Sequence, residues 1–166
     1  MASKRKPLLS TLIIVGEGPV EKAFLSYLKE LYAQNSGQKV KIDAADGGSP
    51  ENIVKKTIGK TKHADYDRKF ILMDSDIEIS DKIRATARKA NIEIIQSEPL
   101  CLEGMLLDLL GLKVPSTNQK CKDLLHPKLS GAATAKDSYK SLITKEILQS
   151  SSIEQIQDLI KIMKKE

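Results

Sequence analysis

Acidic residues stand directly after two of the apolar segments that the sequence predicts to be buried strands. Glu17 follows the first of these segments, and Glu21 comes four residues later. Asp74 and Asp76 follow the third, and because side chains two apart at a strand end face the same side, both can converge on one cation. Carboxylate oxygens suit Mg²⁺ or Mn²⁺, which combine a few protein carboxylates with phosphate oxygens. We therefore expect Glu17, Asp74 and Asp76 to hold a divalent metal for phosphate chemistry.

Each of these acids also has a simpler interpretation. Glu21 could serve only to stabilise the positive end of a helix dipole, and Asp74 or Asp76 alone could be a turn residue. Three carboxylates placed together without a cation would repel one another. Their joint occurrence with Glu17 therefore favours a metal site.

Two glycines and two lysines are candidate phosphate contacts. Gly16 and Gly18 have no side chains, so the backbone on either side of Glu17 is accessible. Pro19 suits the first position of a helix, whose unpaired N–H groups would point at the same place and could hold a phosphate. Lys128 and Lys136 lie in or beside a predicted lid and could reach such a phosphate, although solvated lysines are the common case.

The elements that must position these residues alternate between strand and helix patterns. Strands are expected at 11–15, 40–44, 69–73 and 92–96; the first and third are apolar runs, and the second alternates weakly between apolar and polar residues. Helices are expected from Pro19, from Pro50, from Ser80 to about Ala90 and from Pro99 to Leu110. This order predicts an α/β fold with a mostly parallel, Rossmann-like sheet of about four strands flanked by helices.

The pattern changes in the last third of the chain. Residues 113–135 show little periodicity, which predicts a long loop or a lid. Two helices are expected after it, from about 137 to 149 and from about 152 to 164. We interpret 1–111 as the α/β core and 112–166 as a loop plus helical extension of the same domain.

Bulk composition narrows the class of protein. The 166 residues are 40% hydrophobic, enough for one core, and contain no run of about 18 apolar residues. We expect a cytoplasmic protein without a membrane segment, with Cys101 and Cys121 as reduced thiols.

The positive charge is concentrated in the last third of the chain. Residues 113–166 carry 10 basic and 6 acidic residues, hence +4 of the net charge of +5, and are the better candidate for contact with a polyanion. His63 and His126 have no ligand-spaced partner and are expected at the surface.

In combination, the acidic motifs resemble a known family. A strand ending in Glu-Gly-x-x-Glu, followed by a strand ending in Asp-x-Asp, resembles a TOPRIM domain, and the closest likeness is to the RloB-like proteins of restriction and phage-defence loci. The third motif of those proteins, Ser-x-Pro followed by a Glu, is matched as well. The matching residues are Glu17, Gly18 and Glu21, then Asp74 and Asp76, then Ser97, Pro99 and Glu103. The resemblance covers residues 11–110.

The resemblance implies roles for five acids. Glu17 would be the general acid/base or a metal ligand. Asp74 and Asp76 would be metal ligands, with Glu21 and Glu103 as supporting acids of the same site. The activity implied is Mg²⁺- or Mn²⁺-dependent phosphodiester hydrolysis on DNA or RNA, in defence against foreign nucleic acid.

Two other functions stay open at this point. The fold could serve as a non-catalytic module that binds nucleic acid or a partner protein, as one subunit of a defence complex. The same acids could also act in a small-molecule phosphohydrolase. The sequence has only two Phe and four Tyr, which argues against recognition of single strands by base stacking.

Overall fold

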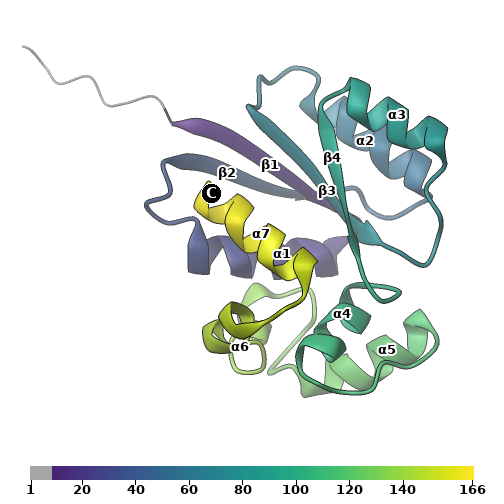
Figure 1. Ribbon diagram of the computed structural model, residues 1–166, viewed down its shortest axis with the longest axis vertical. Helices are drawn as coiled ribbons and strands as arrows, with labels where there is room; N and C mark the ends of the chain where they lie inside the picture. The colour runs from purple at the N-terminus through teal and green to yellow at the C-terminus, as the bar shows by residue number, and fades with distance from the viewer. Residues whose placement is uncertain (1–8) are drawn as a thin grey trace, which may run out of the picture.

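The chain forms an α/β structure, which a computed structural model describes for residues 9–166 (Figure 1). The strands are β1 (Ser10–Gly16), β2 (Gln38–Ala44), β3 (Arg68–Asp74) and β4 (Ile92–Ser97). The helices that alternate with them are α1 (Pro19–Tyr32), α2 (Pro50–Thr61), α3 (Asp81–Lys89) and α4 (Leu102–Leu109). The rest of the chain adds α5 (Asn118–Leu125), α6 (Lys145–Ser150) and α7 (Glu154–Lys164), with 3₁₀ turns η1 (His126–Lys128) and η2 (Lys136–Tyr139). The first eight residues of the expected core segment lie outside the described residues.

The four strands form one parallel sheet in the order β2-β1-β3-β4. This confirms the expected α/β fold with a four-strand parallel sheet flanked by helices, and each expected strand agrees with the observed one to within one or two residues. The central strands β1 and β3 each contain four consecutive buried apolar residues, Leu12–Val15 and Phe70–Met73, as expected where both faces of a strand are covered. In the edge strand β2, exposed Lys39 and Lys41 alternate with buried Val40.

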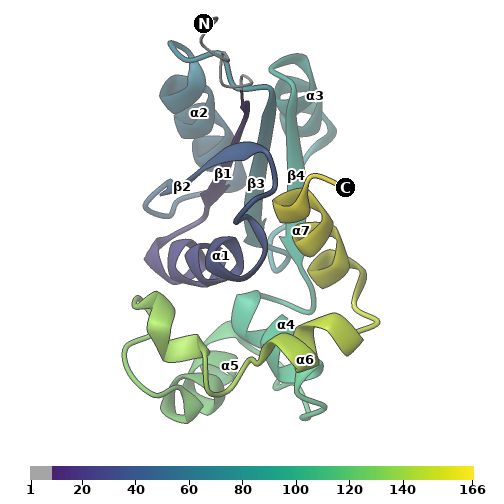
Figure 2. The same cartoon turned by 90° about the vertical axis from the view of Figure 1, so that its left-hand side faces the viewer.

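Each face of the sheet has its own apolar core, because alternate side chains of a strand point to opposite faces. Leu12 and Ile14 of β1 pack in one cluster with side chains of α1, α4 and α7. Ile13 and Val15 pack in a second cluster with side chains of α2 and α3. Figures 1 and 2 show this division, with α1 and α7 on one side of the sheet and α2 and α3 on the other.

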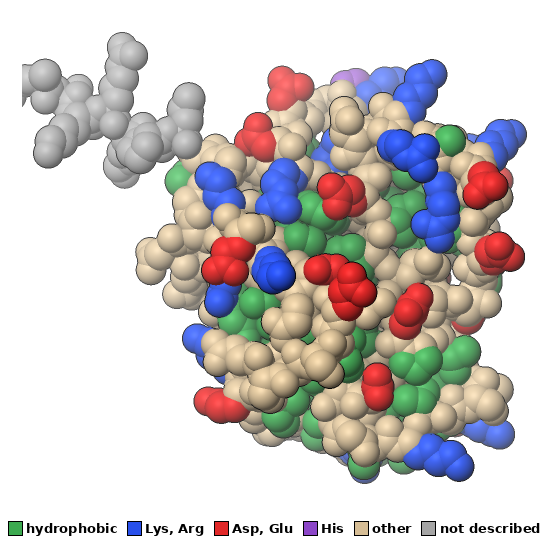
Figure 3. Space-filling model, in the orientation of Figure 1, with side chains coloured by type: hydrophobic (Ala, Val, Ile, Leu, Met, Phe, Trp, Pro, Cys, Tyr) green, Lys and Arg blue, Asp and Glu red, His purple; other side chains and the backbone are tan. Residues whose placement is uncertain are grey.

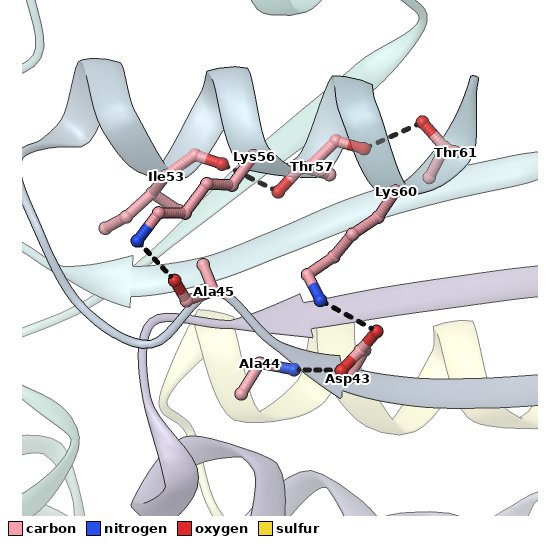
Figure 4. A network of polar contacts seen from close by, with 8 residues as sticks. All are labelled: Asp43, Ala44, Ala45, Ile53, Lys56, Thr57, Lys60 and Thr61. Carbon is pink, nitrogen blue, oxygen red and sulfur yellow. Dashed lines mark hydrogen bonds and ion pairs between the residues drawn. The ribbon is translucent and has the colours of Figure 1, made fainter.

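Helix α2 is tied to the end of β2 by two lysines (Figure 4). The Lys60 ammonium lies 3.3 Å from a carboxylate oxygen of Asp43, and Lys56 donates to the carbonyl oxygen of Ala45 at 2.9 Å. At the start of the helix, the Ser49 hydroxyl accepts a hydrogen bond from the N–H of Asn52. These contacts fix one covering helix against the carboxyl end of an edge strand.

The segment before α4 differs from the sequence prediction. A helix was expected from Pro99, but α4 begins at Leu102, because Leu100 has a φ of 65° and cannot belong to a right-handed helix. The carbonyl oxygen of Leu100 instead accepts hydrogen bonds from the N–H groups of Ser75 (3.0 Å) and Asp76 (3.1 Å). The turn after β4 is therefore bonded to the turn after β3.

The predicted loop or lid over 113–135 is wrong in its centre, where the chain forms α5. Thr117 begins this helix by accepting a hydrogen bond from the N–H of Lys120 at 3.2 Å. Cys121 and Leu125 are buried, and the helix packs against α4. A polar loop would leave these two apolar side chains exposed, so packing selects the helix.

The single helix predicted over 137–149 is also wrong. The chain forms η2 and then α6, because Tyr139 and Ile143 are drawn into the core and Thr144 begins a new helix as its N-cap. The hydroxyl of Tyr139 donates to the carbonyl oxygen of Ala133 at 2.7 Å. The last predicted helix is confirmed as α7.

The last third of the chain shares a core with the sheet. The rings of Phe24 and Tyr139 meet edge to face with their centroids 5.8 Å apart, and both lie in the cluster on the α1 face.

Charges of both signs are interspersed on the surface seen in Figure 3, where Lys and Arg side chains gather over α2 and α3. None of the helices in residues 9–166 combines the length and the apolar composition that a membrane-spanning helix requires.

Candidate metal site

The candidate site lies where the strand order of the sheet reverses. The chain passes from β1 to its neighbour β2, and then returns to place β3 on the other side of β1. The helix after β1 covers one face of the sheet and the helix after β3 covers the opposite face. Open α/β sheets bind ligands at such a reversal point, outside the carboxyl ends of the two strands, and we call the region outside the ends of β1 and β3 the crevice.

Three carboxylates converge in this crevice. Glu17, Glu21 and Asp74 each offer an oxygen atom, and these atoms lie within 4.8 Å of one another. The strand register brings them together, because Gly16 of β1 is paired with Leu72 of β3. The N–H of Glu17 donates to the carbonyl oxygen of Leu72 at 3.0 Å, and the N–H of Asp74 donates to the Glu17 carboxylate at 2.9 Å. The three side chains thus come from two neighbouring strand ends and one helix start.

Glu21 is held by the start of α1. Its carboxylate accepts a hydrogen bond from the N–H of Gly18 at 3.0 Å, and its side chain is only 8% exposed. The expected phosphate contact through Gly18 is therefore not supported, since this N–H is already paired. Gly16 has a packing role, because a Cβ there would lie 2.7 Å from the Cβ of Glu21 and 3.1 Å from the backbone nitrogen of Lys22.

Glu103 and Asp76 stand at the margins of the three acids. Glu103, in the first turn of α4, is 2% exposed and has one carboxylate oxygen 2.9 Å from Nε2 of His126. Asp76 is exposed, and its carboxylate accepts a hydrogen bond from the side-chain amide of Asn118 at 2.8 Å. Asp76 is not among the residues whose oxygens lie within 4.8 Å of one another, so it lies at the rim rather than in the centre.

Two buried oxygen atoms of the site have no hydrogen-bond partner in residues 9–166. They are Oδ1 of Asp74 and Oε2 of Glu103. Buried carboxylate oxygens are costly unless a donor or a cation satisfies them. The donor set consists of oxygens only, which are the ligands that hard divalent cations prefer. The residues present therefore fit a metal ion.

Burial and crowding oppose ionisation of these acids. The pKa of Asp74 is raised to about 8, mainly by burial and secondly by the neighbouring charges of Glu17 and Glu21. Burial also raises the pKa of Glu17 and the pKa of Glu21. A backbone hydrogen bond from Asp74 and the positive charge of Lys122 act in the other direction on Glu17. A bound divalent cation favours the ionised form of each acid, and metal binding would therefore reverse these shifts.

Helix α5 and the residue directly after it add three polar side chains that the sequence analysis did not place at the site. Asn118 and His126 contact two of the acids, and Lys122 lies between them in the sequence. His126 was expected at the surface; its side chain is 33% exposed, and it also pairs with Glu103, which the sequence spacing did not indicate. The spacing of four residues from Asn118 to Lys122 to His126, beside the apolar residues of the same helix, is the signal that could have found them.

Of the two lysines expected at a phosphate, Lys136 lies away from the acids of the site. Lys136 is 3.0 Å from a carboxylate oxygen of Glu30, near the end of α1 that is remote from Glu21. Lys136 is thus not brought to the site, because its ion pair holds η2 against α1. Lys128 is exposed in η1, two residues after His126, and makes no ion pair with residues 9–166.

Cys101 precedes α4 and is fully buried, and burial raises the pKa of its thiol. It is a packed side chain near the acids.

Comparison of the chain with models of protein families, with curated proteins and with solved structures gives no match. The chemistry of the site therefore rests on its own geometry, which offers one buried and two half-buried carboxylates able to hold a metal ion.

Proposed function

We propose that this protein is a metal-dependent phosphodiesterase acting on nucleic acid, of the TOPRIM type that its motifs resemble, with Mg²⁺ or Mn²⁺ as cofactor. One observation carries the proposal: Glu17, Glu21 and Asp74 converge within 4.8 Å at the reversal point of a parallel sheet. The unpaired buried oxygens of Asp74 and Glu103 support it, because a bound cation would satisfy them.

The acids of the crevice would have different roles in catalysis. Glu17 and Asp74 would hold the metal, and Glu21 and Glu103 would support it. The metal, when bound, would polarise the phosphate and stabilise the leaving oxygen. The alternative role of Glu17 is that of the general acid or base, because its carboxylate is held within the group of three acids by the N–H of Asp74. Asp76, at the rim, would orient Asn118 or complete the ligand set.

The positive charge of the last third of the chain supports a nucleic acid as substrate. Residues 113–166 carry +4 of the net charge of +5. Lys122 of α5 and Lys128 of η1 lie in this segment and could contact a phosphate backbone. We place this activity in the cytosol, in defence against foreign DNA or RNA, since Cys101 and Cys121 are free thiols.

Cleavage of single- and double-stranded DNA and RNA in the presence of Mg²⁺ or Mn²⁺ tests the proposal. We expect cleavage that EDTA abolishes, and a loss of about 100-fold or more in kcat/KM for Asp74→Asn. Asp108→Asn is the matched control, because this exposed aspartate of α4 lies outside the acidic set.

Two results would contradict the proposal. Wild-type activity in Asp74→Asn would show that the acids are not the active site. Metal binding without cleavage of any polynucleotide would favour the non-catalytic binding module, and release of phosphate from nucleotides alone would favour a small-molecule phosphohydrolase.

A further inference from the structure

The polar face of α5 stands over the acidic crevice. The side-chain amide of Asn118 donates to Asp76 at 2.8 Å, and Nε2 of His126 lies 2.9 Å from Glu103. These contacts fix both ends of the face, since Asn118 begins the helix and His126 directly follows it. Residues four apart on a helix lie on the same side, one turn from each other. Lys122 is therefore placed between the two contacts, with its side chain toward the crevice.

Lys122 is half-buried and has no ion-pair partner in the described part of the chain. Other lysines near acids do pair, as Lys60 does with Asp43 and Lys136 with Glu30. The charge of Lys122 nevertheless reaches the site, where it lowers the pKa of Glu17. A lysine in this position has an ammonium group that is free to meet an anion.

We infer that Lys122 binds a phosphate oxygen of the substrate beside the acidic crevice, as the central residue of the α5 face. The inference rests on the proposed function and deepens it. The carboxylates of the crevice are acceptors and cannot bind a phosphate directly, whereas an ammonium group binds it as a point charge. The anion would then lie between Lys122 and the metal-holding acids.

The charge balance of the crevice also selects the class of substrate. When a bound divalent cation keeps the five acids ionised, their negative charge outweighs the positive charge of the cation and Lys122 together, so a second negative charge on the ligand would meet repulsion. An internal phosphodiester carries one negative charge, whereas a terminal phosphate carries about −1.5 to −2 at neutral pH. The site therefore favours an internal phosphodiester of a polynucleotide over a terminal phosphate.

Binding of short oligonucleotides without terminal phosphates to the full chain tests the role of Lys122. Ca²⁺ replaces Mg²⁺ to slow turnover, and affinity is measured by fluorescence anisotropy over a range of salt concentrations. We expect Lys122→Gln to weaken binding by about tenfold and to lower the slope of log Kd against log salt by about one. Lys122→Arg keeps the charge and should recover most of the affinity.

Lys120→Gln is the matched control, because Lys120 is an exposed lysine two residues away on the opposite side of the same helix. It should bind oligonucleotide as the wild type does. Mn²⁺ affinity, measured by calorimetry, should be unchanged or tighter in Lys122→Gln, since a positive charge near the metal is removed. A retained Mn²⁺ affinity also shows that this variant is folded.

Equal oligonucleotide affinities and salt slopes for Lys122→Gln and Lys120→Gln would overturn the inference, as would tighter binding of inorganic phosphate than of the oligonucleotide. If metal-dependent cleavage persists in Lys122→Gln with the wild-type KM, the inference fails and the proposed function stands. If the wild type binds no Mn²⁺, the proposed function fails first.

Discussion

The carboxyl group of Asp74 links the stability of the metal-free protein to pH. Its pKa is raised from 3.8 to about 8 in the folded state, so between these values the folded protein binds a proton that the unfolded chain has released. The free energy of unfolding of the metal-free protein should therefore fall as the pH rises from about 4 to about 8. Glu17 and Glu21 add to this fall, because burial raises the pKa of each.

Replacing Asp74 by Asn removes its share of this pH dependence. In EDTA, we expect Asp74→Asn to melt at a higher temperature than the wild type at pH 8 and to show a smaller decline between pH 5 and pH 8. Thermal melting across this range measures the effect, with Asp108→Asn as the control that keeps the wild-type profile. Parallel pH profiles for Asp74→Asn and the wild type would show that Asp74 does not titrate in this window.

At the level of the element, the start of α1 determines the position of Glu21. Gly16 permits α1 to begin against the end of β1, where an added Cβ would lie 2.7 Å from the Cβ of Glu21. We expect Gly16→Ala to reduce the free energy of unfolding by on the order of 1–3 kcal/mol, because the helix start must move. Urea unfolding measures this change, and a weaker affinity for Mn²⁺ should accompany it.

Gly59 supplies the opposite case within helix α2. A Cβ at Gly59 would meet no atom within 4 Å, and the residue is exposed. Gly59→Ala should therefore raise the free energy of unfolding by about 0.5–1 kcal/mol, through better helix propensity. If both alanine variants shifted stability in the same direction, close packing at Gly16 would not be the cause.

On the scale of the whole molecule, the last helix completes the core on the α1 face of the sheet. Leu159 of α7 is fully buried in the cluster that contains Leu12 and Phe24. Leu159→Ala should lower the free energy of unfolding by about 2–5 kcal/mol, because it opens a cavity in this shared core. Leu112→Ala, at a leucine that is 39% exposed, should change it by less than about 0.5 kcal/mol.

Urea unfolding followed by far-UV circular dichroism and by tyrosine fluorescence measures both leucine variants. The sequence contains four Tyr and no Trp, so tyrosine emission reports on the core directly. We expect the two signals to share one midpoint in each variant, because residues on both sides of residue 111 lie in one cluster. An early transition confined to the last third of the chain would show that the extension unfolds separately.

The sequence by itself predicted the sheet and the chain segments that carry the acids. Runs such as Leu12 to Val15 are apolar on both strand faces, and this local pattern is enough to indicate a buried parallel strand. Placement of Glu17 and Asp74 at strand ends followed from the same runs. Their meeting could be expected because the carboxyl ends of parallel strands lie at one edge of the sheet.

Only the tertiary structure decided what covers the acids. The short helix α5 shows little hydrophobic periodicity in the sequence. It forms where Cys121 and Leu125 are buried and the helix packs against α4. That packing brings His126 to Glu103 and the charge of Lys122 near Glu17, whereas the Glu30 ion pair holds Lys136 away. Periodicity along the chain encodes which side of an element is apolar, but the partner of a polar side chain depends on which elements meet, and that depends on contacts between residues distant in the sequence.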